Sequence, residues 1–107
     1  MRNYYDTYEI EVPAGSELTV ETITGREGAL PYITSVGREI PADTDFLLYV
    51  NDTLVIDIPQ SLKMGFDNFI PFYFQLALND VVKAGFRNRS ITVNTLRFTL
   101  QYFYPGA

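Results

Sequence analysis

The side chains that most often perform catalysis are missing from this sequence. The chain of 107 residues contains no histidine and no cysteine, so it lacks the commonest general base at neutral pH, the commonest metal ligand and the thiolate nucleophile. Pairs of carboxylates could still support glycoside hydrolysis. The spacing of the aspartates singles out no such pair; they include Asp43, Asp45, Asp52, Asp57, Asp67 and Asp80. We therefore predict a protein that is not an enzyme and has no catalytic residues.

Asp57 is the least ordinary of these acids. It interrupts the apolar run Val55–Ile58, where an unpaired buried carboxylate would be costly. An outward-facing position or a structural ion pair is favoured over a catalytic role. Arg97 and Lys63 are the candidate partners in that ion pair.

Asp43 and Asp45, with Asn51 and Asp52 nearby, offer the oxygen ligands that Ca²⁺ prefers. The spacing of a complete calcium-binding loop is absent, and acidic residues in turns commonly cap and solvate the loop instead. We predict no metal site and no cofactor, and the sequence leaves calcium binding at Asp43 and Asp45 open.

Three further motifs and one basic cluster carry little functional signal. Asn51-Asp52-Thr53 and Asn88-Arg89-Ser90 match the N-glycosylation pattern, but no secretory signal is visible at the N-terminus. Gly25–Gly28 lacks the lysine and the strand-to-helix context of a phosphate loop. Arg87 and Arg89 could meet an acidic patch or a phosphate, although a solvated turn is the simpler interpretation.

The charge of the chain limits its partners. A net charge of −5 argues against nucleic acid and anionic membranes, because both require a basic face. Residues 1–57 contain 11 acidic and 3 basic residues, whereas residues 58–107 contain 2 and 5. This asymmetry would favour head-to-tail packing of copies, but the simpler interpretation is that the halves neutralise one another within one fold. No apolar run is long enough for a transmembrane helix, and synthesis in the cytoplasm is expected.

The alternation of apolar and polar residues indicates strands. The length suits one domain covering residues 1–107. Runs rich in β-branched and aromatic residues are separated by Gly, Pro, Asn and Asp, which is typical of an all-β protein with a single antiparallel β-sandwich or jelly-roll-like fold. About seven strands are predicted, over residues 4–12, 17–24, 30–36, 46–50, 53–58, 69–78 and 90–104.

Some segments allow more than one interpretation. Residues 59–68 are expected to form a loop or a short helical turn, and a second helical turn is allowed near residues 79–84. Pro31 suits an edge strand or the start of a strand, since it cannot donate to a ladder. In residues 90–104 the apolar positions change parity near Asn94, which indicates a β-bulge that lets one strand bend between two sheets.

The clearest local signal is a hairpin with the turn Asn51-Asp52 between Phe46–Val50 and Thr53–Ile58, because Asn and Asp tolerate the positive φ of a type I′ turn. Ideal pairing places Leu48 beside Val55. Both faces of the hairpin are then largely apolar, so we expect it to be central in the fold or covered by another chain.

Aromatic residues also gather at the two ends of the chain, where an isolated domain usually becomes polar. Tyrosine combines a large apolar ring with a polar end and is enriched at interfaces. We therefore predict an interface with protein partners or other copies of the chain. Its candidate residues are Tyr4, Tyr5, Leu47, Tyr49, Tyr102 and Tyr104.

In general character, on the patterns of Leu47–Ile58 and Leu96–Tyr104, the chain resembles the small β-sandwich structural proteins of phage and virus particles. The resemblance implies a capsid, decoration or tail-associated subunit located in the virion, and it transfers no site residues. The alternative is a carbohydrate-binding or receptor-binding module with a glycan as partner. An exposed aromatic pair beside Asn, Asp or Arg in a concave face would favour that alternative, whereas flat apolar patches would favour assembly.

Overall fold

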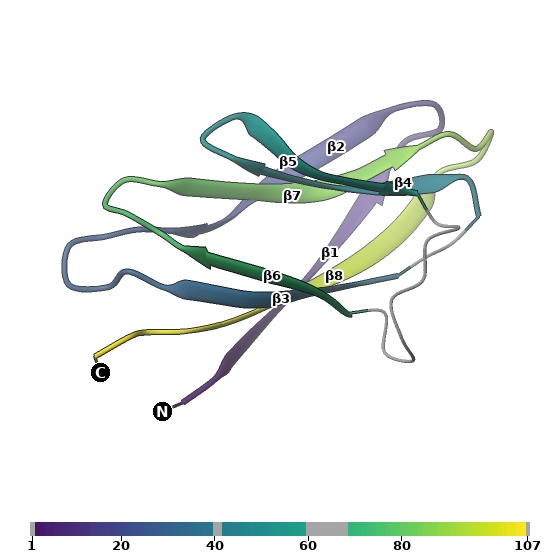
Figure 1. The fold of residues 1–107 in the computed structure, drawn as a ribbon. Helices are drawn as coiled ribbons and strands as arrows, with labels where there is room; N and C mark the ends of the chain where they lie inside the picture. Colours follow the sequence, from purple (N-terminus) through teal and green to yellow (C-terminus); the bar gives the residue numbers. More distant parts are fainter. Residues whose placement is uncertain (1, 40–41, 60–68, 107) are drawn as a thin grey trace.

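The computed structural model describes residues 2–39, 42–59 and 69–106. These residues form eight strands in two four-stranded antiparallel sheets, and the predicted all-β sandwich is confirmed (Figure 1). The described residues include no helix that could cross a membrane. The first sheet has the order β1-β8-β3-β6 and the second has the order β2-β7-β4-β5. The strands are β1 (Tyr4–Val12), β2 (Glu17–Thr24), β3 (Tyr32–Arg38), β4 (Thr44–Val50), β5 (Thr53–Pro59), β6 (Phe69–Gln75), β7 (Val81–Asn88) and β8 (Asn94–Phe103).

Strand pairing is nested from the ends of the chain to its middle. β1 pairs with β8, β2 with β7, β3 with β6 and β4 with β5, always in the antiparallel sense. Within the sheets β8 also pairs with β3, and β7 with β4. The chain is therefore arranged as one long antiparallel ribbon folded across itself, and both termini lie at the same end of the sandwich (Figure 1).

Three predictions for the C-terminal third were wrong. Residues 79–84 form no helical turn, because Asn79 takes a φ of 69° in a tight turn and β7 begins at Val81. The strand predicted over residues 90–104 begins only at Asn94. The change of parity near Asn94 marks the end of a loop and the start of β8 rather than a β-bulge. The prediction for residues 60–68 lies outside the described part of the chain.

The tight hairpin between β4 and β5 is confirmed. Asn51 and Asp52 have φ angles of 50° and 66°, as a type I′ turn requires. The strand ends pair as predicted, but the register then shifts and Leu48 lies opposite Ile56 instead of Val55. The partners predicted beyond the first two pairs were therefore wrong, because a β-bulge next to the turn is invisible to an alternation pattern.

β4 lies between β7 and β5 in the second sheet, which explains why both of its faces are apolar. Phe46, Leu48 and Val50 belong to the core cluster. Leu47, on the opposite face, is also fully buried, and it lies opposite Gly85 of β7. The hairpin is thus central through β4, whereas β5 is an edge strand.

The centre of the core contains three phenylalanines that join the two sheets. Phe46 and Phe86 come from neighbouring strands of the second sheet, and their ring centroids are 5.5 Å apart. Phe98 of β8 in the first sheet lies 5.8 Å from Phe46 and 6.1 Å from Phe86. All three side chains are at most 2% exposed. Phe98 therefore contacts both other rings across the space between the sheets, while Phe46 and Phe86 contact each other within their sheet, in the tilted and edge-on arrangements that aromatic rings favour.

β3 lies inside the first sheet, between β8 and β6. Pro31 directly precedes it, so the missing N–H removes no ladder hydrogen bond, and the Pro31 carbonyl accepts a hydrogen bond of 3.0 Å from the Leu76 amide. Pro31 was predicted to lie either in an edge strand or at the start of a strand, and the structure shows the second of these positions. Between Ile33 and Ser35 the register shifts relative to both neighbouring strands. Against β8, Thr34 is the extra residue of a β-bulge, whereas against β6 the extra residue lies on β6, between Pro71 and Phe74.

Gly85 allows β2 and β7 to approach closely. A Cβ atom at this position would lie 1.9 Å from the backbone oxygen of Leu18, and backbone cannot move aside as a flexible side chain can. We predict that Gly85→Ala lowers the free energy of unfolding by at least about 2 kcal/mol, measured by urea denaturation. Thr95→Ala, at an exposed position of β8, should change it by less than about 0.5 kcal/mol. Equal urea-denaturation midpoints for the two variants would contradict the close approach of β2 and β7.

Candidate binding surfaces

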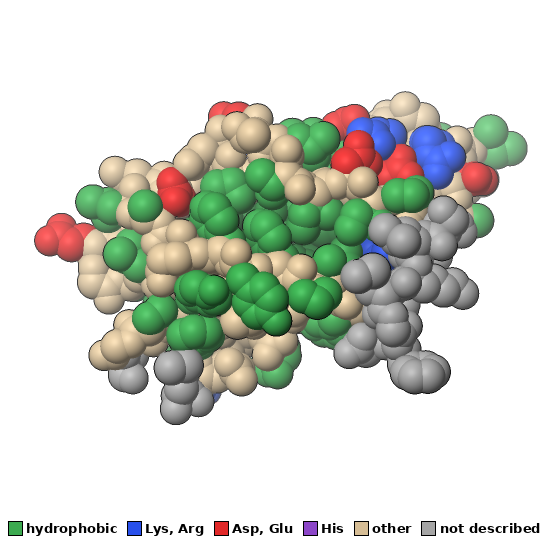
Figure 2. Space-filling view, viewed as in Figure 1, with side chains coloured by type: hydrophobic (Ala, Val, Ile, Leu, Met, Phe, Trp, Pro, Cys, Tyr) green, Lys and Arg blue, Asp and Glu red, His purple; other side chains and the backbone are tan. Residues whose placement is uncertain are grey.

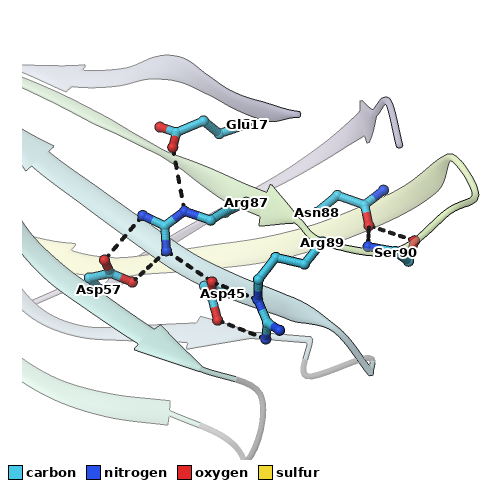
Figure 3. A network of polar contacts seen from close by, with 7 residues as sticks. All are labelled: Glu17, Asp45, Asp57, Arg87, Asn88, Arg89 and Ser90. Carbon is cyan, nitrogen blue, oxygen red and sulfur yellow. Dashed lines mark hydrogen bonds and ion pairs between the residues drawn. The ribbon is translucent and has the colours of Figure 1, made fainter. Parts of the chain in front are cut away.

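A network of charged side chains covers the outer face of the second sheet at one end (Figure 3). Arg87 of β7 is its centre. Its guanidinium group forms two hydrogen bonds of 3.1 Å with the carboxylate of Asp57, one of 2.9 Å with Asp45 and a longer one of 3.4 Å with Glu17. Asp57 is therefore in a structural ion pair, as favoured from the sequence, but its partner is Arg87 rather than Arg97.

Asp45 is the buried member of this network, since its side chain is only 8% exposed. Arg89 donates to both of its oxygens, from Nε at 3.1 Å and from an η nitrogen at 3.2 Å. Burial alone would raise the pKa of Asp45, but the hydrogen bonds from Arg89 and Arg87 outweigh it, and the pKa is lower than its ordinary value. Asp45 is thus held as a carboxylate and is unsuited to donate a proton as a general acid.

Every ion pair found among the described residues joins an acid of residues 1–57 to a base of residues 58–107. Besides the Arg87 network, Lys83 contacts Asp52 at 2.9 Å and Arg97 contacts Glu39 at 3.3 Å. The charge asymmetry of the sequence is therefore compensated within one fold. This compensation weakens the argument for head-to-tail packing that rested on charge alone.

The remaining candidate chemistry serves local structure. Asp80 accepts hydrogen bonds from the Ala77 amide at 2.8 Å and from the Asn51 side chain at 2.6 Å, which lower its pKa and fix two adjacent turns. Among the described residues no three acidic side chains are grouped closely enough to hold a metal ion. The Asp43 carbonyl accepts a hydrogen bond from the Arg89 amide, and the Asp45 oxygens face arginines, so neither arrangement resembles a calcium loop.

Asn88 builds the loop between β7 and β8. The side chain is fully buried, and its amide nitrogen donates to the carbonyls of Val12 at 3.0 Å and Thr92 at 2.8 Å. Its side-chain oxygen accepts hydrogen bonds from the amide and the hydroxyl of Ser90 and from Asn94. The match to the glycosylation pattern at Asn88 is therefore a structural feature, because a buried amide cannot carry a glycan.

This loop reverses the usual distribution of polar and apolar side chains. Ser90, Thr92 and Asn94 are used within its hydrogen-bond network. Ile91 and Val93 alternate with them and are 96% and 54% exposed. The loop projects from the end of the sandwich opposite the termini (Figure 1). Alternating apolar residues among loop-forming ones were the available signal, but the sequence predicted a strand here.

The aromatic residues at the two ends of the chain pack against each other, because β1 and β8 are neighbours. The Tyr4 ring stacks on Tyr102 at 5.5 Å and meets Tyr104 edge-on at 5.5 Å. Tyr102 is only 6% exposed, and its hydroxyl donates to Asp6 at 2.9 Å; burial and this hydrogen bond raise its pKa. Tyr102 is therefore unavailable to a partner in this fold.

The other predicted interface residues are divided between the two sheets. Leu47 is fully buried, so it offers no contact surface. Tyr49 is half-buried on the second sheet, where its hydroxyl donates to Glu17 over 3.5 Å. Tyr5 is 59% exposed on the first sheet. The structure therefore does not bring the predicted residues together into one surface.

The outer face of the first sheet has a hollow of about 680 Å³, lined by Asn3, Tyr5, Thr34, Ser35, Phe69, Pro71, Tyr73, Gln101 and Phe103. One cross-strand row runs through it, since Tyr5 pairs with Gln101, Gln101 with Ser35 and Ser35 with Pro71. Tyr73 on edge strand β6 is 69% exposed. Tyr73 was not among the predicted interface residues, although an aromatic residue at a solvent-facing position of a strand was a usable signal.

Hydrogen bonds connect the polar residues of the hollow. The Ser35 hydroxyl donates to the Gln101 side-chain oxygen at 2.6 Å, and the Gln101 side-chain nitrogen donates to the Tyr5 hydroxyl at 3.2 Å. The Thr34 hydroxyl donates to the Gln101 carbonyl at 3.2 Å. Thr34 and Ser35 are consecutive, yet both line the hollow, because the β-bulge breaks the alternation of side chains at Thr34.

No protein-family model and no curated protein matches this chain. Among solved structures, the chain is similar to the nucleoplasmin-like N-terminal domain of Drosophila FKBP39, with a TM-score of 0.48 and 7% sequence identity over 96% of this chain and 92% of that one.

Asp45→Asn tests the importance of the charge network. The variant keeps the shape of the side chain but leaves two arginines without their shared buried carboxylate, and we expect a loss of about 2 kcal/mol in the free energy of unfolding at neutral pH. Because the folded-state pKa of Asp45 lies below its ordinary value of 3.8, this contribution is present above that value and is lost as the pH falls through the folded-state pKa. The difference between variant and wild type should therefore shrink in acid, measured by urea denaturation at several pH values.

Glu17→Gln is the matched control, since Glu17 contacts the same arginine from a side chain that is 48% exposed. It should cost less than about 0.5 kcal/mol at any pH. A constant difference between Asp45→Asn and wild type from neutral pH to strong acid would contradict the assigned role of the carboxylate.

Proposed function

We propose that this protein is a non-catalytic structural subunit that associates with other copies of itself. The observation that carries the proposal is the loop between β7 and β8, on which Ile91 is 96% and Val93 54% exposed. Burying an aliphatic side chain of this size contributes about 1.5–3 kcal/mol. The loop is fixed by the buried Asn88, so docking it costs little conformational entropy.

A second apolar region supports assembly. Figure 2 shows hydrophobic side chains gathered on the side of the molecule where the edge strands β5 and β6 lie. On β5, Leu54 and Val55 are 41% and 45% exposed. On β6, the rings of Phe72 and Phe74 stack at 6.0 Å and are only partly buried against the core. Edge strands with exposed apolar residues are surfaces on which chains associate.

The nested pairing of β1 with β8, β2 with β7, β3 with β6 and β4 with β5 supports a jelly-roll assignment. Jelly rolls occur in viral capsid proteins and in lectin domains. We propose that the subunit belongs to a virion, as a capsid, decoration or tail-associated protein. Fold alone does not define function, so the proposal depends on the exposed loop and its test.

A carbohydrate-binding module is the second candidate, and one observation favours it. The hollow on the first sheet places two exposed tyrosines, Tyr5 and Tyr73, beside Asn3 in a concave face. An exposed aromatic pair beside Asn in a concave face favours a glycan as the partner. The hollow and the β7–β8 loop lie on different parts of the molecule, so the two functions are compatible.

The double variant Ile91→Ser, Val93→Ser tests assembly. We expect the wild-type chain to form a concentration-dependent oligomer in size-exclusion chromatography with light scattering. The variant should weaken association at least about tenfold, because the two side chains contribute most of the apolar area that the loop can bury. Both positions are exposed, so the fold and its thermal midpoint should be retained.

Leu30→Ser is the matched control, as it removes an aliphatic side chain that is 39% exposed elsewhere on the surface. It should leave the oligomer unchanged. A monomeric wild-type chain at every concentration, or equal weakening by the control, would contradict the proposal.

A further inference from the structure

We propose that the hollow on the outer face of the first sheet is a binding site for a neutral oligosaccharide. This inference rests on the second candidate function, a carbohydrate-binding module, and names its site and ligand class; it is independent of self-association, which was assigned to the β7–β8 loop. Four features of the hollow carry it: its aromatic walls, its polar floor, its lack of charge and the β-bulge at its centre.

The walls offer flat apolar surfaces on both sides of the sheet. Tyr5 lies on edge strand β1 and Tyr73 on the opposite edge strand β6. Three strand spacings separate these edges, or about 14 Å, which accommodates two sugar rings side by side. Phe103 of β8 also lines the hollow. The C–H faces of a hexose pack against aromatic rings, whereas its hydroxyl groups require polar partners.

The floor supplies such partners. The side-chain oxygen of Gln101 accepts from Ser35, and one N–H of its side-chain amide donates to Tyr5. The second N–H has no partner among the hydrogen bonds of the described side chains. The Tyr5 hydroxyl accepts from Gln101 and keeps its own proton for donation. Ser35 donates to Gln101 and keeps acceptor capacity. The floor therefore presents donors and acceptors in alternation, which matches the dual character of sugar hydroxyls.

The absence of charge sets the ligand class. None of the nine side chains that line the hollow is acidic or basic, although the chain carries 21 charged residues in all, 8 basic and 13 acidic. A phosphate, sulfate or uronate group would find no counter-charge in the hollow, and a cationic ligand would find no carboxylate. Neutral sugars require none. Its volume of about 680 Å³ falls in the range of small-ligand sites.

The β-bulge gives the hollow its second hydroxyl group. In a regular strand Thr34 would point to the face opposite Ser35. The β-bulge against β8, in which Thr34 is the extra residue, brings Thr34 to the lining instead. Bulges are common beside binding sites, where they redirect a side chain.

The test is a titration of the ¹⁵N-labelled full chain with cellotriose, maltotriose and tri-N-acetylchitotriose, followed by amide chemical shifts. We expect at least one of these neutral probes to shift the amides of Thr34, Ser35, Tyr73 and Gln101 at millimolar concentration. Trigalacturonate, an acidic trisaccharide, should shift none of them. Tyr73→Ala should weaken binding about tenfold, whereas Tyr73→Phe, which keeps the ring, should change it by less than about threefold.

Tyr49→Ala is the matched control, because Tyr49 is a partly exposed tyrosine on the outer face of the other sheet. It should leave the titration unchanged. The proposal is overturned if no neutral probe shifts the hollow, if trigalacturonate shifts it equally, or if shifts map to another face. It is also overturned if Tyr73→Ala lowers the molar mass of the oligomer, since the hollow would then be covered by a second copy. If the double variant Ile91→Ser, Val93→Ser loses its oligomers but still binds the sugar, both proposals are supported, because they concern different surfaces.

Discussion

Packing between the sheets is the constraint on which the rest of this structure depends. Main-chain hydrogen bonds hold each sheet together, but the chain has no cysteine to cross-link one sheet to the other. Phe46, Phe86 and Phe98 supply much of that connection, with ring centroids 5.5 to 6.1 Å apart. At the end of the sandwich that carries the β7–β8 loop, Asn88 adds a buried hydrogen bond to the Val12 carbonyl in the other sheet. Because these contacts lie between the sheets, the outer faces can be polar, charged or hollow without weakening the packing of the core.

The sequence predicted those parts of the fold that alternation and turn chemistry determine. The bounds of β1 and β2 and the Asn51-Asp52 turn followed directly from them. The strand β7 was missed because Val81 and Val82 also suit helical spacing, and long-range pairing decided between the two. The register shift between Leu48 and Tyr49 comes from a β-bulge that an alternation pattern does not reveal. The late start of β8 depends on partners far away in the sequence, which no local pattern contains.

The sequence identified a residue that needs a partner, but it did not show which residues lie close together. The lone acid in an apolar strand was correctly expected to need a partner, but Arg87 could be identified only once β4, β5 and β7 were placed side by side. Clustered tyrosines at the termini suggested a surface, although adjacent strands let them pack on each other. The hollow combines side chains from four strands, so no local pattern along the chain shows that Tyr73 and Gln101 lie in one site.

The nested pairing has a consequence for how the chain reaches its native state. β1 finds its partner only in β8, about ninety residues later, and β2 finds its partner only in β7. Most native contacts are thus distant in sequence, and such a topology folds slowly because loop closure precedes most stabilising contacts. On the ribosome the N-terminal half emerges with an excess of negative charge and without its cationic partners. Mutual repulsion among these acids opposes compaction of this half until the arginines of β7 and β8 arrive.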